Sequence, residues 1–144
     1  MTDKSKGEGH CLCGAVYITA WAMSNKVGAC HCGMCRRWTG GPLMAVNCGS
    51  EVTFEGKENI SVFESSQWAE RGFCKKCGSH LFYRLKEENQ YIIPAGIFEN
   101  GENLVFDNQV FIDKKPAYYS FSNETQNMTE AEIFAMYGSS PEKG

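Results

Sequence analysis

The sequence predicts a mainly β fold, built from short antiparallel strands and one short helix near the C-terminus. Short runs of alternating apolar and polar residues, rich in branched and aromatic side chains, recur along the chain. Glycine, asparagine and serine separate these runs and favour turns. The expected strands cover residues 15–21, 43–47, 52–54, 60–63, 80–85, 91–93 and 110–112, with a turn at 87–89.

A helix is predicted near the C-terminus. Thr129 is followed three residues later by Glu132, which is the spacing of a capping box in which each side chain bonds the other's backbone N–H. The apolar face and the terminating glycine that follow are Ile133, Phe134, Met136, Tyr137 and Gly138.

The chain of 144 residues has the length of one domain. We expect this domain over residues 9–138, with flexible segments at 1–8 and 139–144. The net charge of −3 and the absence of a basic run argue against nucleic acid as a partner. The first nine residues are polar and no apolar run is long enough to cross a bilayer, which predicts a cytoplasmic protein without a membrane partner.

Cysteine is the most informative residue type in the chain. Seven of its eight cysteines lie in three tight clusters, and Cys48 stands alone. In a reducing compartment, paired cysteines are more often metal-binding or catalytic than disulfide-linked. The clusters are Cys11 and Cys13; Cys30, Cys32 and Cys35; and Cys74 and Cys77.

The first and last clusters together predict a closed structural zinc site. Cys74 and Cys77 are separated by two residues and precede a glycine, which permits the sharp turn of a zinc knuckle. Cys11 and Cys13 share one face of an extended segment, so both sulfurs can reach one ion. Four thiolates complete the tetrahedron that structural zinc prefers. The alternatives are disulfides or buried cysteines without metal.

The middle cluster predicts a second zinc with an open position. Cys30 and Cys32 share a face, and a turn at Gly33 and Met34 would bring Cys35 back to them. Three thiolates leave a fourth position on zinc, which a substrate thiol could take. The alternative is a second structural site completed by a histidine.

The histidines and the lone cysteine have weaker signals. His31 lies between two predicted ligands, so in an extended segment its side chain should point away from them. His10 and His80 flank the other clusters and are the candidates to complete the second site. Cys48 is expected to be a small buried apolar residue.

The three cysteine motifs in this order resemble the glutathione-dependent formaldehyde-activating enzyme family. The resemblance runs from about Gly9 to Tyr119, and includes the residues around Ala95-Gly96 and Lys115-Pro116-Ala117-Tyr118. It implies a zinc-stabilised fold of the β-tent type. It also implies that Cys11, Cys13, Cys74 and Cys77 hold structural zinc and that Cys30, Cys32 and Cys35 hold zinc at the active centre.

The family's named activity is a carbon–sulfur lyase reaction that joins glutathione and formaldehyde. The resemblance therefore implies glutathione, or a similar thiol, and a small aldehyde as small-molecule partners. Arg36 and Arg37 are candidates to bind the carboxylates of glutathione. Many relatives carry a histidine where this chain has Gln109, so this position bears on substrate choice.

Three other functions are compatible with the same residues. The domain also resembles a centromere-associated protein, which suggests a non-catalytic zinc-binding interaction module. An enzyme of the same chemistry could act on another thiol or electrophile. A thiol redox protein would cycle Cys30, Cys32 and Cys35 through a disulfide instead of holding zinc.

Overall fold

The computed structural model describes residues 4–137. The fold is mostly β, as the sequence predicts, with 45% of residues in strands and two short helices, of which the sequence predicted the C-terminal one. The chain divides into two compact units, the first formed by residues 4–25 and 45–104 and the second by residues 26–44 and 105–137. The expectation of one zinc domain over residues 9–138 stays a prediction.

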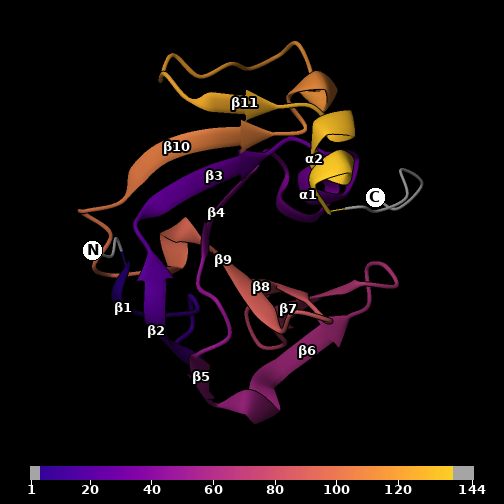
Figure 1. Ribbon diagram of the computed structural model, residues 1–144. Helices are drawn as coiled ribbons and strands as arrows, with labels where there is room; N and C mark the ends of the chain where they lie inside the picture. The colour runs from indigo at the N-terminus through magenta and orange to yellow at the C-terminus, as the bar shows by residue number, and fades with distance from the viewer. Residues whose placement is uncertain (1–3, 138–144) are drawn as a thin grey trace. The chain divides into compact units, whose positions relative to one another are not determined.

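The first unit contains a three-stranded antiparallel sheet with the order β1-β2-β5 (Figure 1). Alternation along β2 sends Ile18 and Ala20 into the core and leaves Tyr17 and Trp21 exposed. Each strand therefore has one apolar and one solvent-facing side. The strands are β1 (Lys4–His10), β2 (Tyr17–Ser24) and β5 (Val52–Glu55).

A second antiparallel series in the same unit has the order β4-β9-β8-β7-β6. The rings of Phe54, Phe82 and Tyr91 pack against one another with centroids 5.1–5.5 Å apart, and the turn after β8 contains Asn89 with a positive φ. The elements are β4 (Leu43–Asn47), of which residues 45–47 pair with β9, η1 (Lys57–Asn59), β6 (Ile60–Phe63), β7 (Ala69–Cys74), β8 (His80–Leu85), β9 (Gln90–Pro94) and η2 (Ala95–Ile97).

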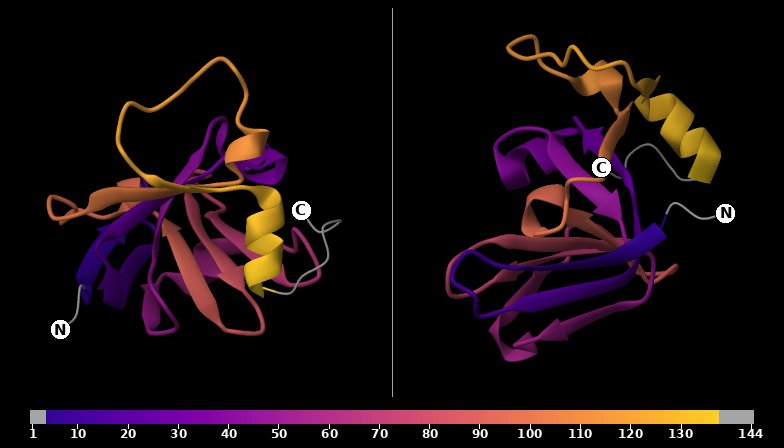
Figure 2. Two further views of the ribbon diagram at one scale, coloured as in Figure 1. Left: turned by 45° about the horizontal axis from the view of Figure 1, so that its top comes forward. Right: turned by 90° about the vertical axis from the view of Figure 1, so that its left-hand side faces the viewer.

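The second unit has parallel rather than antiparallel pairing. Strand β10 pairs in parallel with β3 on one side and with β11 on the other. In Figure 2 the chain between η3 and β11 runs out as a long orange loop before it returns to the strands. The elements are β3 (Lys26–Cys30), α1 (Gly33–Thr39), β10 (Val105–Val110), η3 (Ile112–Lys114), β11 (Gln126–Met128) and α2 (Glu130–Tyr137).

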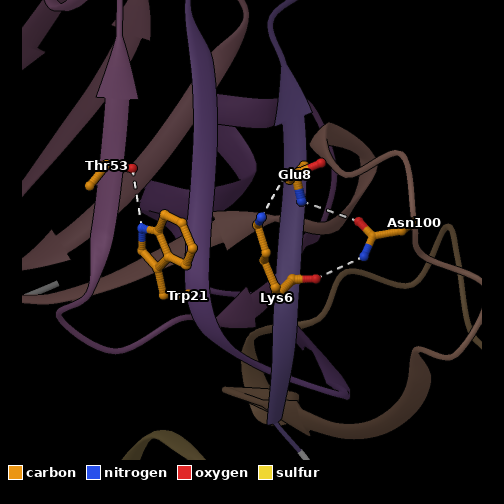
Figure 3. Close-up of polar contacts among 5 residues, drawn as sticks. All are labelled: Lys6, Glu8, Trp21, Thr53 and Asn100. Carbon is orange, nitrogen blue, oxygen red and sulfur yellow. Dashed lines mark hydrogen bonds and ion pairs between the residues drawn. The ribbon is translucent and has the colours of Figure 1, made fainter.

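The N-terminal segment is strand where the sequence predicted a flexible segment. Residues 4–8 belong to β1, and their free edge is covered by the segment that follows η2. Figure 3 shows the Asn100 amide bridging this edge: its oxygen accepts from the Glu8 N–H at 3.2 Å and its nitrogen donates to the Lys6 carbonyl at 2.9 Å. The side chain thus pairs the backbone of an edge strand, which the polar sequence of β1 did not reveal.

The outer face of the same sheet carries further polar contacts. Lys6 pairs with Glu8 at 3.1 Å and lies over the Trp21 ring, whose Nε1 donates to the Thr53 hydroxyl at 3.3 Å (Figure 3). These contacts join β1, β2 and β5 on the exposed side of the sheet.

The strand predicted at residues 110–112 is wrong in its position. Strand β10 ends at Val110, and Phe111 has a φ of 54°, in the left-handed region where a strand cannot continue. The Phe111 ring instead packs against Phe134 of α2, with centroids 6.0 Å apart. The sequence of β10 contains several polar residues and lacks the apolar alternation that predicts a strand. Its pairing with a neighbouring strand on each edge stabilises it instead.

The predicted capping box of the C-terminal helix is confirmed. The Thr129 hydroxyl accepts from the Glu132 N–H at 3.2 Å, and the Glu132 carboxylate accepts from the Thr129 N–H at 2.8 Å. Of the predicted apolar face, Phe134 is buried, whereas Met136 is exposed. Gly138 lies outside the described residues. Between residues 4 and 137, no helix combines the length and the hydrophobicity that a bilayer crossing needs.

We predict that Gly56→Ala destabilises the protein more than Gly49→Ala. Both glycines have a positive φ, which costs an L-residue roughly 1–2 kcal/mol. A Cβ at Gly56 would also lie 2.0 Å from the Ala15 carbonyl oxygen, whereas a Cβ at Gly49 would meet nothing within 4 Å. Urea denaturation of both variants measures the difference, and equal losses of unfolding free energy would contradict the backbone clash.

Candidate metal centres

The first cysteine cluster lies in the first unit, where two tight turns face each other. After β1, the Gly14 N–H donates to the Cys11 carbonyl at 3.1 Å, and Gly14 has a φ of 81°. After β7, the Gly78 N–H donates to the Cys74 carbonyl at 2.7 Å, and Gly78 has a φ of 82°. Each glycine lets its turn close around the sulfurs, as the knuckle spacing predicted.

The sulfur positions in this cluster fit a tetrahedral metal. The sulfurs of Cys11, Cys13, Cys74 and Cys77 all lie within 4.8 Å of one another. The Sγ atoms of Cys11 and Cys13 are 3.7 Å apart, and those of Cys13 and Cys74 are 3.8 Å apart. A tetrahedral zinc with zinc–sulfur bonds of about 2.3 Å separates its sulfurs by about 3.8 Å.

Backbone and hydroxyl donors surround these sulfurs. The Val16 N–H donates to Cys11 Sγ and the Lys76 N–H donates to Cys74 Sγ, each at 3.4 Å. Ser79 Oγ lies 3.2 Å from Cys77 Sγ, and this hydrogen bond lowers the pKa of Cys77 to about 5. Donors aimed at sulfur favour the thiolate form, which is the form that binds metal.

The second cysteine cluster lies in the second unit, at the junction of β3 and α1. Cys30 ends β3, and Cys32 is the N-cap of α1. The Cys32 sulfur accepts from the Cys35 N–H at 3.4 Å, because the first turn of the helix places residue i+3 beside its N-cap. A helix, rather than the simple turn expected at Gly33 and Met34, therefore brings Cys35 back. In the sequence, this helix is indicated only by the glycine pair after Thr39, because Gly40 has a φ of 90° and ends the helix.

The three sulfurs of this cluster also lie within 4.8 Å of one another. Hydrogen bonds from the Cys30 and Cys35 thiols lower the pKa of Cys32 to about 2, whereas the same contacts raise the pKa of Cys30. Both shifts arise because the three sulfurs lie so close together. A divalent cation would replace the thiol protons and neutralise the thiolates that form.

The two groups that the structure brings together are the two that the spacing predicted. No histidine joins either cluster among the described residues. All eight cysteines are free thiols, so the disulfide alternative finds no support in their positions. Cys48 is buried, and burial raises the pKa of its thiol to about 12, which confirms it as a small apolar residue of the core.

His31 is fully buried and points away from the sulfurs on either side of it. Its Nε2 lies 2.8 Å from Gln109 Oε1 of β10, and its Nδ1 lies 2.8 Å from the Tyr119 hydroxyl. The Tyr119 ring stacks on the imidazole, with centroids 5.5 Å apart. Burial lowers the pKa of His31 and so favours the neutral ring. The sequence connected Gln109 with substrate choice but gave no sign of its contact with His31.

The other predicted residues have structural partners. His10 contacts Glu99 through Nε2 at 2.9 Å and the Cys11 carbonyl through Nδ1 at 2.7 Å. Burial lowers the pKa of His80. Arg36 Nε donates to the His31 carbonyl at 2.9 Å, and Arg37 donates to the Gly33 carbonyl at 3.2 Å. A substrate role for either arginine stays a prediction.

This mainly β chain with two thiol clusters matches a known family and two known proteins. Residues 6–114 match the family model described as glutathione-dependent formaldehyde-activating enzyme. A protein of Schizosaccharomyces pombe described as an uncharacterized lyase is 41% identical over 127 residues, which cover 88% of this chain and 93% of that protein. A crystal structure of a Rhodobacter sphaeroides protein has 25% identity and a TM-score of 0.57, and covers 65% of this chain and 88% of that one.

The chain therefore belongs to the glutathione-dependent formaldehyde-activating enzyme family. The match includes both cysteine clusters and Gln109, and it stops before the loop that carries Tyr119. The expected family resemblance is confirmed over this range.

We predict that Ser79→Ala makes the first cluster lose its metal at a higher pH during acid titration. The hydrogen bond from Ser79 depresses the pKa of Cys77, so its loss lets protons compete with the metal earlier as the pH falls. We expect a rise of up to about one pH unit in the midpoint, which corresponds to the low end for a hydrogen bond to a charged group. A chromophoric chelator reports metal release, Ser50→Ala is the control, and identical midpoints would contradict the assignment.

Proposed function

We propose that this protein is a zinc-dependent carbon–sulfur lyase that forms or breaks an adduct between a glutathione-like thiol and a small aldehyde. The observation that carries the proposal is the difference between the two clusters. Four sulfurs converge in one cluster and three in the other. Four thiolates close a structural zinc site, whereas three leave a position for a ligand from outside.

The residues present fit zinc in both places. Cys11, Cys13, Cys74 and Cys77 would hold the structural ion, since their sulfur separations suit a tetrahedron. Cys30, Cys32 and Cys35 would hold the second ion, whose affinity rests on three protein ligands. When bound there, zinc would supply the positive charge that lowers the pKa of a substrate thiol and favours its thiolate.

The reaction itself is an addition without redox change. The thiolate sulfur attacks the carbonyl carbon of the aldehyde, a carbon–sulfur bond forms, and the π electrons move to oxygen, which takes up a proton. The product is a hydroxyalkyl thioether, and the reverse steps return thiol and aldehyde. Holding both reactants in one place supplies much of the acceleration, because it removes the entropy cost of their encounter.

The arginines beside the second cluster are our candidates for substrate binding. Arg36 is held against the carbonyl of His31 by its Nε, which leaves the rest of its guanidinium beside the cluster to pair with a carboxylate. Glutathione carries two carboxylates, and the family description names this thiol. We assign the weaker role to Arg37, whose side chain is exposed and bonds its own helix.

We propose the cytoplasm as the location. Both clusters need reduced thiols, and all eight cysteines are free. The reducing cytoplasm maintains that state and also holds abundant low-molecular-weight thiol.

We predict two zinc ions per chain and different losses for the two clusters. Cys74→Ser should remove the structural ion and several kcal/mol of stability, because metal binding to a closed site is coupled to folding. Cys32→Ser should lose only the second ion and keep a cooperative thermal melt. Cys48→Ala is the control outside both clusters and should retain both ions. Elemental analysis and circular dichroism measure these outcomes. If Cys32→Ser unfolds the protein as severely as Cys74→Ser, the open-site assignment is wrong.

We predict that the wild-type protein accelerates exchange between free formaldehyde and its glutathione adduct. Exchange NMR with labelled formaldehyde measures the rate with and without protein. Cys32→Ser should reduce the protein-dependent rate at least 100-fold, because the second site would no longer hold a thiolate. A zinc-loaded wild-type protein with no effect on the rate would reject the lyase and favour a binding module.

A further inference from the structure

The environment of His31 supplies a hydrogen-bond chain with a defined direction. Gln109 Nε2 donates to Thr125 Oγ1 at 2.9 Å, and Thr125 Oγ1 donates to Asn127 Oδ1 at 2.7 Å. The nitrogen of the Gln109 amide therefore faces Thr125, and its oxygen faces His31. Because an amide oxygen only accepts, His31 Nε2 carries the proton that is donated to Gln109.

The other ring nitrogen follows from the first. Nδ1 lies 2.8 Å from the Tyr119 hydroxyl, and in the neutral imidazole it accepts from that hydroxyl. Lys115 Nζ holds the backbone of Tyr119 by donating to its carbonyl at 2.6 Å. The imidazole is thus fixed at both nitrogens, from β10 on one side and from the loop after η3 on the other.

The backbone of His31 is also held by hydrogen bonds, and it connects the fixed imidazole to the two cysteines on either side. His31 lies between Cys30 and Cys32, and its N–H donates to the Val110 carbonyl at 3.2 Å. Its carbonyl accepts from Arg36 of α1. With ring, N–H and carbonyl all bonded, the residue has little freedom to rotate. The separation of the sulfurs on either side of it is then set by this anchored residue.

Gln109 has no free polar end for a substrate. It is buried, both ends of its amide are bonded, and its strand register places it beside Ala29, one residue before Cys30. Gln109 therefore acts on the cluster through His31 and not through contact with a substrate. A buried partner of this kind changes geometry rather than ligand chemistry.

We infer that Gln109 is a positioning residue: by accepting from His31 Nε2, it sets the spacing of the Cys30, Cys32 and Cys35 sulfurs and so tunes the metal affinity of that cluster. The inference rests on the proposed function only in taking this cluster as a metal site. It requires neither glutathione nor aldehyde.

The test compares three glutamine variants in the full chain. Gln109→Met removes the acceptor at nearly constant length, and Gln109→Glu keeps an oxygen that can accept from His31 Nε2. Gln126→Met, an exposed glutamine on β11, is the matched control. Competition with a chelator gives the Zn²⁺ affinity of the second cluster, and Co²⁺ substitution gives the sulfur-to-metal charge-transfer band. Neither readout depends on catalysis.

We expect Gln109→Met to weaken zinc binding roughly tenfold, the low end for partners behind a metal site, and to change the Co²⁺ band. Gln109→Glu and Gln126→Met should stay within about threefold of wild type. A folded Gln109→Met protein with wild-type affinity and spectrum would overturn the inference, as would an equal loss in Gln109→Glu. If Gln109→Met fails to fold, Thr125→Val decides, because it removes the hydrogen bond that orients Gln109 and should also weaken zinc binding.

The outcomes separate this inference from the proposed function. A wild-type protein that binds two zinc ions without lyase activity would reject the function and leave the role of Gln109 standing. If the wild-type protein is active and Gln109→Met binds zinc with the wild-type affinity, the positioning role alone is rejected.

Discussion

The structure of the first unit depends on four sulfur atoms that come from two distant segments. Cys13 and Cys74 are 61 positions apart in the chain, yet their sulfurs lie 3.8 Å from each other. Holding such a long loop closed costs conformational entropy, and four thiolates brought this close repel one another unless protons or a cation intervene. The turns at Gly14 and Gly78 and the N–H donors aimed at sulfur are the means by which the backbone meets this constraint.

The second unit also brings sulfur atoms close together, but it does so by local structure. Its three sulfurs come from one short segment, so no long loop has to be closed. What must be controlled is the direction of each side chain along that segment. A helix N-cap brings Cys35 to Cys32, and the buried histidine between Cys30 and Cys32 is bonded at both ring nitrogens. Strand β10 supplies one partner of that histidine, Gln109, and the loop between η3 and β11 supplies the other, Tyr119.

The difference between the cluster of four thiols and the cluster of three gives the proposed chemistry a physical basis. A closed cluster contributes stability and has no position left for a substrate, whereas a cluster of three thiols can exchange its fourth ligand. An open site needs its geometry supplied by the surrounding protein, because the metal has fewer ligands to organise it. The buried polar network around His31 can supply that geometry, since both ring nitrogens of His31 and both the oxygen and the nitrogen of the Gln109 side-chain amide have a hydrogen-bond partner.

Much of the structure of this protein can be predicted from sequence alone, because the patterns that indicate it involve residues close together in the chain. Cysteine spacing, glycine after the knuckles, alternation in the strands and the Thr129–Glu132 box each act over a few residues, so they predicted both cysteine groups, most strands of the first unit and the C-terminal helix. Tertiary structure decided the remainder. Strand β1 pairs with β2 on one edge and bonds Asn100 on the other, β10 lies between two parallel neighbours, and Cys32 caps α1. His31, Gln109 and Tyr119 meet across 78 and 88 positions, and no local pattern encodes hydrogen bonds made over such separations.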